Sequence, residues 1–223
     1  MSFPALLSLS LCFSMMSAGF LHSMPDRDPA STLFVVNTSY RISGDFIPDV
    51  RSAGVPGQSR HLQAEAAHAL EGLFAAAKQE QLNLYSKSAY RSYGRQKVIF
   101  GRKVNANKGS EEKANLYVAL PGASEHQLGL AADIIGRGDA LHPKFADTAE
   151  GRWLAENAHR YGFIIRYPQG KEWITGIQYE PWHLRYVGKK VAEEMLHAGL
   201  SLEEYTSKKR AEHYQYLLNL NKD

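Results

Sequence analysis

The sequence predicts an α+β fold: a single compact domain in which helices flank a small, mostly antiparallel sheet that carries the functional site. Three observations lead to this expectation. Apolar residues between 60 and 77 recur at three- and four-residue steps, as in an amphipathic helix. Short apolar or alternating segments of strand length occur on both sides of that stretch. Helical and strand patterns do not alternate strictly, which argues against a parallel βαβ sheet.

Composition sets the broad class of the protein. With 223 residues, 44% hydrophobic and 22% charged, the chain can bury one substantial core and is too apolar for a disordered protein. Its 26 basic and 23 acidic residues give a formal net charge of +3 without a long block of one sign. This pattern argues against nucleic acid as a partner. A mildly basic surface favours encounter with an anionic polymer such as a cell wall.

The start of the chain is expected to be separate from the folded domain. Residues 1–22 are expected to form a signal peptide or membrane leader, because this leucine-rich segment has no charged side chain before His22. Residues 23–31 resemble a linker, and the domain is expected over 32–223. We therefore expect an extracytoplasmic bacterial protein, secreted or associated with the membrane or cell wall. The single cysteine, Cys12, lies in the leader, so the domain has no thiol chemistry or disulfide.

The first half of the domain contains five recognisable segments. The apolar, partly β-branched run 33–36 suits a buried strand, and 46–50 an extended segment crossing a surface. One amphipathic helix follows from residue 60. The segment 82–89 suits a strand that leads into a turn, and a second helix is expected from Arg95.

The second half alternates between short helices and strands. A short helical piece is expected within 111–118, and a longer helix from about 148 to 160. Two strands are expected at 163–166 and 174–179, the latter leading into a second histidine-containing motif. A capping-box pattern beginning at Ser201 predicts a last helix.

Two histidines stand beside carboxylates at close spacing. His126 lies in Ser-Glu-His-Gln-Leu-Gly-Leu-Ala-Ala-Asp, which ends at Asp133, and His183 closes Glu-Pro-Trp-His, which begins at Glu180. Zinc binds neutral imidazole nitrogen and carboxylate oxygen, and a catalytic zinc site keeps three protein ligands and one open position. His126, Asp133 and His183 supply such a set. Glu180 then remains as a nearby carboxylate available to take a proton from water.

The second motif has a geometric requirement. Residues three apart in a regular strand point to opposite faces, so Glu180 and His183 converge only if Pro181 bends or interrupts the strand. Gly129, between the first two ligands, would let the backbone pack tightly. On spacing alone, an alternative stays open in which these are ordinary polar residues near strand ends, because a seven-residue gap is no standard zinc signature.

Three motifs in a fixed order identify a family. They are Ser-Ala-Tyr-Arg-Ser-Tyr at 88–93 followed by Gln96, Ser-x-His-x-x-Gly-x-Ala-x-Asp at 124–133, and Glu-Pro-Trp-His at 180–183. From about residue 33 to 198, the sequence resembles the VanY-like D-alanyl-D-alanine carboxypeptidases, zinc peptidases that trim bacterial peptidoglycan stem peptides. The resemblance favours the zinc interpretation over ordinary polar residues.

The resemblance implies a role for each matching position. One catalytic zinc ion would be held by His126, Asp133 and His183, and Glu180 would be the catalytic base.

The resemblance also implies contacts with the substrate. Arg91 would assist binding of a substrate carboxylate or of the transition state, while Gln96 and Ser124 would contact the peptide end. The residue types suit these roles, because Arg is a rigid, charged fork and Gln and Ser add neutral hydrogen bonds.

The expected reaction is hydrolysis of the terminal D-alanine from peptidoglycan stem peptides, by attack of a water that Glu180 deprotonates. One alternative is an L,D-carboxypeptidase acting on tetrapeptide stems, since such enzymes share the three motifs and differ only in the pocket. Another, of a different class, is a non-catalytic zinc-containing module that binds the cell wall. The presence of Glu180 disfavours that module, because a structural site needs no base.

Overall fold

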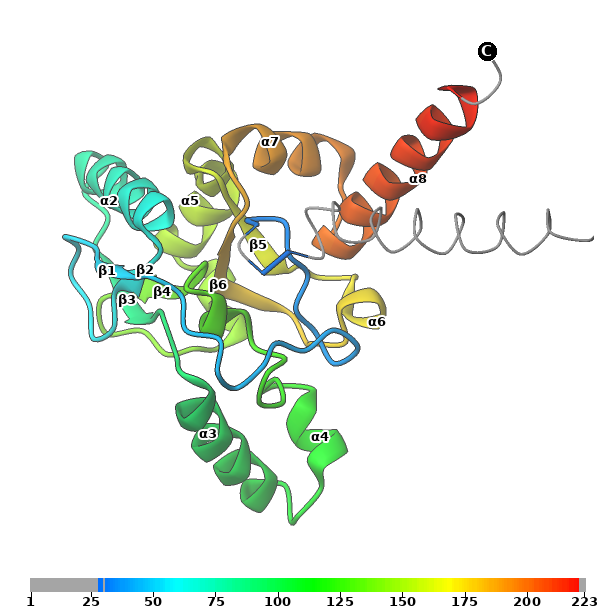
Figure 1. Cartoon of the computed structure of the whole chain (residues 1–223). Coiled ribbons are helices and arrows are strands. Elements are labelled where there is room, and N and C mark those ends of the chain that lie inside the picture. Colours follow the sequence, from blue (N-terminus) through cyan, green and yellow to red (C-terminus); the bar gives the residue numbers. More distant parts are fainter. Residues whose placement is uncertain (1–27, 30, 221–223) are drawn as a thin grey trace, which may run out of the picture.

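The computed structural model describes residues 28, 29 and 31–220 (Figure 1). The expected leader 1–22 and most of the linker 23–31 lie outside the described residues. The strands are β1 Arg51–Ser52, β2 His61–Leu62, β3 Leu84–Ser88, β4 Ala131–Gly136, β5 Phe163–Tyr167 and β6 Glu180–Tyr186. The α-helices are α2 Ala64–Gln79, α3 Tyr93–Ala106, α4 Glu111–Asn115, α5 Ala149–Asn157, α6 Glu172–Thr175, α7 Lys189–Ala198 and α8 Leu202–Leu220. Short 3-10 helices span Glu125–Leu128, Pro143–Asp147 and Ala158–Tyr161.

The main sheet is antiparallel throughout, with the strand order β3-β4-β6-β5. The predicted α+β class with a small antiparallel sheet is therefore confirmed. The central pair, β4 and β6, is in regular register, with Asp133 opposite His183 and Ala132 opposite Leu184. Residues directly opposite each other share one face of a sheet. The Asp133 carboxylate and the His183 imidazole thus point to the same side of the sheet.

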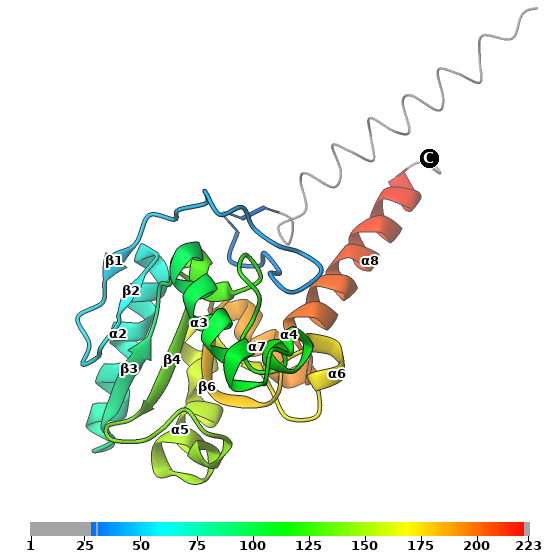
Figure 2. The same ribbon diagram turned by 90° about the horizontal axis from the view of Figure 1, so that it is seen from below.

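The two faces of this sheet have different characters. Ala132, Ile134 and Leu184 belong to the main hydrophobic core, and α2 and α5 cover that face (Figure 1). Helices α3 and α4 lie on the other side of the sheet, in front of it in Figure 2. Asp133 and His183 point to this second face, because side chains alternate along a strand.

The predicted helix from residue 60 begins later than expected, at Ala64. Residues 61 and 62 instead pair with 51 and 52 as the two-stranded β1–β2 ribbon. The apolar spacing nonetheless predicts the buried face correctly: Leu70, Leu73 and Phe74 all pack into the core. The second helix begins at Tyr93, slightly before the predicted Arg95, with the Ser92 hydroxyl accepting a hydrogen bond from the Arg95 amide as its N-cap.

Two predicted strands are wrong. Within 33–36, Leu33 is partly buried and residues 34–36 are buried, but none of them belongs to a strand. The Nη2 of Arg185 donates to the carbonyls of Thr32 (2.8 Å) and Phe34 (2.9 Å), so a buried guanidinium, rather than a neighbouring strand, satisfies part of this backbone. Residues 174–179 complete the short helix α6 and then form a loop. The strand starts only at Glu180 and contains the second motif itself.

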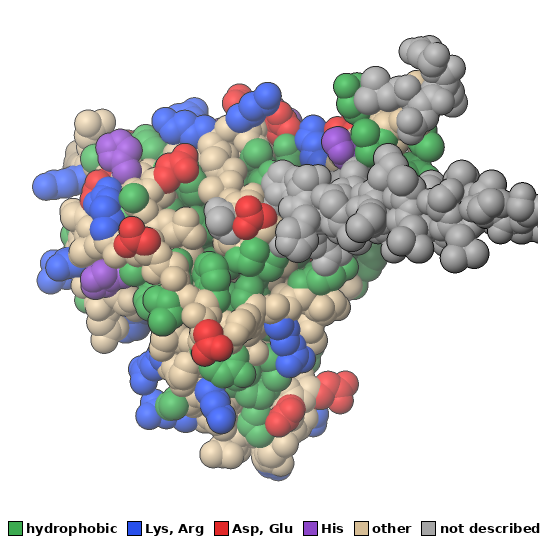
Figure 3. All heavy atoms as spheres, in the orientation of Figure 1, with side chains coloured by type: hydrophobic (Ala, Val, Ile, Leu, Met, Phe, Trp, Pro, Cys, Tyr) green, Lys and Arg blue, Asp and Glu red, His purple; other side chains and the backbone are tan. Residues whose placement is uncertain are grey.

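The last helix forms as its capping pattern predicts. The Ser201 amide donates to Glu204 Oε2 (2.8 Å), and the Glu204 amide donates to Ser201 Oγ (3.3 Å). From this start α8 projects away from the body of the domain (Figure 1). Within the described ranges, no helix combines the length and apolarity that a bilayer crossing requires. Basic and acidic side chains are interspersed over the face shown in Figure 3.

We expect Gly129→Ala to lower the free energy of unfolding by about 1–3 kcal/mol, measured by urea denaturation. Gly129 has φ +69°, and an added Cβ would lie 2.7 Å from Val50 Cγ1. The matched control is Gly101→Ala, in the middle of α3 with nothing within 4 Å of the added Cβ. That variant should gain about 0.5–1 kcal/mol. Equal effects of the two substitutions would contradict the tight packing of Gly129.

Candidate active site

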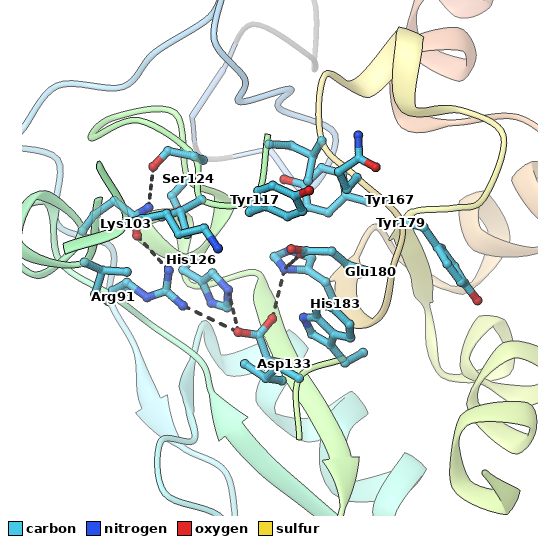
Figure 4. A pocket seen from close by; sticks show the side chains of 18 of the residues that line it. Arg91, Lys103, Tyr117, Ser124, His126, Asp133, Tyr167, Tyr179, Glu180 and His183 are labelled. Atoms are coloured by element: carbon cyan, nitrogen blue, oxygen red, sulfur yellow. Dashed lines mark hydrogen bonds and ion pairs between the residues drawn. The ribbon is translucent and has the colours of Figure 1, made fainter. Parts of the chain in front are cut away.

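One cavity of about 700 Å³ opens on the polar face of the main sheet. Every residue that the sequence predicts for the site contributes to its lining, and all of them except Gln96 are labelled in Figure 4. These residues are Arg91, Gln96, Ser124, His126, Asp133, Glu180 and His183. Segments far apart in the chain therefore meet at a single place.

His126 is held in a defined orientation by the segment that follows β3. Its Nδ1 lies 2.7 Å from the carbonyl oxygen of Ala89, and its own carbonyl accepts a hydrogen bond from the Arg91 amide (3.1 Å). A carbonyl only accepts, so Nδ1 must carry the proton and Nε2 is left with its lone pair. This Nε2 atom lies 3.3 Å from Asp133 Oδ2. Burial lowers the pKa of His126 and favours the neutral imidazole that binds metals.

Asp133 and His183 approach each other across the β4–β6 pair. His183 Nδ1 lies 3.0 Å from Asp133 Oδ1, yet this oxygen makes no hydrogen bond with any described residue. Both side chains are almost completely buried. A buried carboxylate oxygen without a hydrogen bond needs another partner. Here Asp133 Oδ1 and His183 Nδ1 are placed so that both could give an electron pair to an ion between them.

The arrangement fits a metal ion. One ligand atom from each of His126, Asp133 and His183 lies within 4.8 Å of the others. Two imidazole nitrogens and one carboxylate oxygen form a ligand set that zinc accepts, with a position left for water or substrate. His126 would bind through Nε2 and His183 through Nδ1, because those atoms face Asp133.

Glu180 reaches this cluster because β6 is irregular at its start. Tyr167 pairs with Glu180 and Ile165 with Leu184, so β6 advances four residues while β5 advances two. The shift falls between Glu180 and Leu184, a stretch that contains Pro181, whose nitrogen cannot donate to a ladder. Glu180 Oε2 consequently lies 3.6 Å from His183 Nδ1. β6 itself stays continuous from Glu180 to Tyr186, and the expected departure from regular geometry takes the form of this register shift.

Arg91 forms the opposite wall of the site. Its Nη2 donates to Ser88 Oγ (2.9 Å) and lies 3.6 Å from Asp133 Oδ2, while Nη1 donates to Gln96 Oε1 (2.8 Å). Gln96 Nε2 donates in turn to the carbonyl of Ala119 (2.6 Å). Both ends of the Gln96 amide are thus engaged within the protein, and Gln96 holds Arg91 in place.

Burial and neighbouring charges shift the pKa values of Glu180 and His183. Burial raises the pKa of Glu180 to about 8, so this carboxyl binds a proton readily near neutral pH. At His183 burial disfavours the charged ring, yet the facing carboxylates of Asp133 and Glu125 raise its pKa to about 9. Metal binding at neutral pH would therefore release a proton from His183.

Glu125 is a residue of this region that sequence reasoning missed. It is fully buried behind His183, and its Oε1 accepts hydrogen bonds from Arg166 Nε (2.7 Å) and Arg185 Nη1 (2.6 Å). Burial penalises its charge, but the two guanidinium groups outweigh this and hold its pKa well below the usual range. Arg166 in the otherwise apolar β5 and Arg185 next to Leu184 in β6 were the signal that a buried acid faces them.

Comparison with known proteins identifies the family. A sequence model of the D-alanyl-D-alanine carboxypeptidase family, VanY, matches residues 55–189, which is more than half of the chain. The chain belongs to the VanY family of D-alanyl-D-alanine carboxypeptidases. It is 50% identical over 191 residues to YodJ of Bacillus subtilis, a match that covers 82% of this chain and 69% of that protein.

Two solved structures show how far the likeness to this family extends in space. The LD-carboxypeptidase LdcB, described with the basis of its peptidoglycan recognition, superposes with a TM-score of 0.76 at 49% identity, over 81% of this chain and 87% of LdcB. A mutant of the vancomycin-resistance D,D-pentapeptidase VanY, solved with Zn(II), superposes with a TM-score of 0.67 at 36% identity, over 78% and 98% of the two chains. The VanY-family fold is therefore present here.

We expect Glu180→Gln to stabilise the metal-free protein at pH 8 by about 1 kcal/mol or more, because Gln resembles the protonated acid that burial favours. The folded pKa of about 8 lies above the ordinary 4.5, so wild-type stability from this group is lost as pH rises between these values. The difference between the variants should vanish below pH 4.5. Urea unfolding of chelator-treated protein at several pH values measures it, and a pH-independent difference would contradict the shifted pKa.

Proposed function

We propose that this chain is a zinc-dependent carboxypeptidase that releases the terminal D-alanine from peptidoglycan stem peptides. The observation that carries the proposal is the convergence of His126, Asp133 and His183 in one buried cluster, with Glu180 beside it in the same cavity. Membership of the VanY family supports the reaction class. The Zn(II) complex of a VanY structure supports the metal.

Glu180 is the base in this proposal. A zinc ion held by His126, Asp133 and His183 would supply Lewis acidity, which would lower the pKa of a water and polarise the scissile carbonyl. Glu180 takes a proton from the attacking water, whose oxygen bonds to the carbonyl carbon before the terminal residue. As the C–N bond breaks, Glu180 returns the proton to the leaving amine of D-alanine. Its raised pKa suits a group that must both accept and return a proton near neutral pH.

Arg91 is the charged partner for the substrate. Its guanidinium is fixed by Ser88 and Gln96 on the wall opposite Glu180, so it would meet a peptide carboxylate or the developing oxyanion without further ordering. Ser124, nearly buried in the same cavity, offers a neutral hydrogen bond to the peptide end. Gln96 would act through Arg91 in addition to the contact that the sequence resemblance implies.

Two bond specificities are compatible with this site. Family membership favours a D,D-carboxypeptidase, which cuts D-Ala-D-Ala at the end of a pentapeptide stem. An L,D-carboxypeptidase cutting tetrapeptide stems is the second candidate, because identity to LdcB (49%) exceeds identity to VanY (36%). A non-catalytic wall-binding module is disfavoured, since it would have no use for a base at the position of Glu180. We also propose an extracytoplasmic location, which rests on the leader expected over residues 1–22.

We expect the zinc-loaded full chain to release D-alanine from synthetic stem peptides, detected by mass spectrometry of the products. Release from the pentapeptide alone assigns D,D-specificity, and release from the tetrapeptide alone assigns L,D-specificity. No hydrolysis of either peptide by zinc-loaded protein would contradict the enzyme and favour the wall-binding module.

We expect Glu180→Gln to keep its zinc and to lose on the order of 10²-fold or more in turnover, the effect of removing a general base. Elemental analysis and the stem-peptide assay give the two readouts. His183→Ala is the matched comparison, because it removes a ligand and should lose the metal as well as the activity. Wild-type turnover in Glu180→Gln would rule out its role as the base.

A further inference from the structure

His183 presents its two ring nitrogens to different carboxylates. Nδ1 faces Asp133 Oδ1 at 3.0 Å and Glu180 Oε2 at 3.6 Å, on the side of the cavity. Nε2 points the other way, and Glu125 Oε2 lies 3.8 Å from it. The imidazole therefore stands between the metal-ligand cluster and a buried carboxylate that is not one of the ligands.

The two atoms that face each other on this side, His183 Nε2 and Glu125 Oε2, are both buried polar atoms. Neither His183 Nε2 nor Glu125 Oε2 has a hydrogen-bond partner among the described residues, and both are shielded from solvent. A buried donor or acceptor without a partner costs about 1–3 kcal/mol. A separation of 3.8 Å exceeds a charge-assisted hydrogen bond of about 2.7–2.9 Å by roughly 1 Å. A small rotation of the ring would close the gap and satisfy both atoms.

Glu125 itself is held so that only its second oxygen is available. Arg166 Nε and Arg185 Nη1 both donate to Oε1. Arg166 is also bound by the Glu203 carboxylate of α8, with Nη1 at 2.9 Å from Oε2 and Nη2 at 2.6 Å from Oε1. Arg185 is anchored to the carbonyls at 32 and 34. The carboxylate is thus fixed from two sides, and Oε2 remains directed at His183.

We propose that Glu125 is a positioning residue for the metal site: its Oε2 accepts a hydrogen bond from His183 Nε2–H and thereby presents the Nδ1 lone pair to the metal. The inference rests on the proposed zinc site. Glu125 touches neither substrate nor reacting atoms. It fixes the tautomer and the ring angle of His183 as the Ala89 carbonyl does for His126, but with a charged acceptor that also makes the ligand more basic.

The test compares Glu125→Gln with Glu203→Gln in the full chain. Both replace a carboxylate of the same arginine network by an amide of equal size, but only Glu125 faces His183. We expect Glu125→Gln to weaken zinc binding by about 10–100-fold, measured by competition with a chelator of known affinity. Glu203→Gln should lower the melting temperature and leave the zinc dissociation constant within about twofold of wild type. Circular dichroism verifies that each variant is folded.

Two results would overturn the proposal. One is a folded Glu125→Gln protein that binds zinc as tightly as wild type. The other is equal weakening of zinc binding in both variants, which would mean that the network acts only through general stability.

A second measurement decides the question if Glu125→Gln does not fold. In a crystal structure of the zinc-loaded wild-type chain, we expect zinc on His183 Nδ1, and Nε2 within about 3 Å of Glu125 Oε2. Zinc on Nε2, or an Nε2–Oε2 distance still beyond 3.5 Å, would contradict the proposal. Failure of the wild-type chain to bind zinc would instead contradict the proposed function, and this inference with it. Normal hydrolysis and zinc binding by the wild type, with an unaffected Glu125→Gln variant, would contradict this inference alone.

Discussion

The register between β4 and β6 is the constraint on which the rest of the site depends. Asp133 and His183 are directly opposite, so their side chains share a face and meet at 3.0 Å. A slip of one residue would turn one of them into the apolar core and bring an apolar side chain into the cavity. Ala132 and Leu184 prevent such a slip, because both are fully buried on the other face beneath the helices. Packing on one face therefore sets the metal-ligand geometry on the other.

The remaining groups reach this pair through irregular backbone. His126 comes from a 3-10 helix that is bound at its imidazole and its carbonyl by the chain after β3. Glu180 reaches the site through the register shift at the start of β6. Regular alternation would turn this residue away from the side of His183. Regular strands thus supply rigidity, and the departures from regularity direct the other functional groups into the cavity.

The buried charges behind the site have a geometric consequence. A buried ionic cluster is weak support for stability by itself, because desolvation of the charges offsets most of their attraction. Arg166 and Arg185 nevertheless connect Glu125 to α8 and to the carbonyls at 32 and 34. The first residues of the domain and α8 are therefore both linked, through these arginines, to the carboxylate that lies behind His183. The same cluster includes the buried segment 34–36, in which the Phe34 carbonyl accepts a hydrogen bond from a guanidinium rather than from a strand.

The sequence by itself determined the helices with strong apolar periodicity, the final helix cap and the residue types of the site, because these depend on local spacing and side-chain chemistry. It also indicated that the strand must depart from regular geometry near Pro181, by a bend or an interruption, since alternation would otherwise separate Glu180 from His183. It failed at 33–36 and 174–179, where short apolar runs are compatible with strand, loop or helix and only tertiary partners choose between them. Only the tertiary structure decided which nitrogen of each histidine faces the metal site and that Glu125 stands behind His183. Those contacts join residues far apart in the chain, such as Glu125 and His183, and no local pattern encodes them.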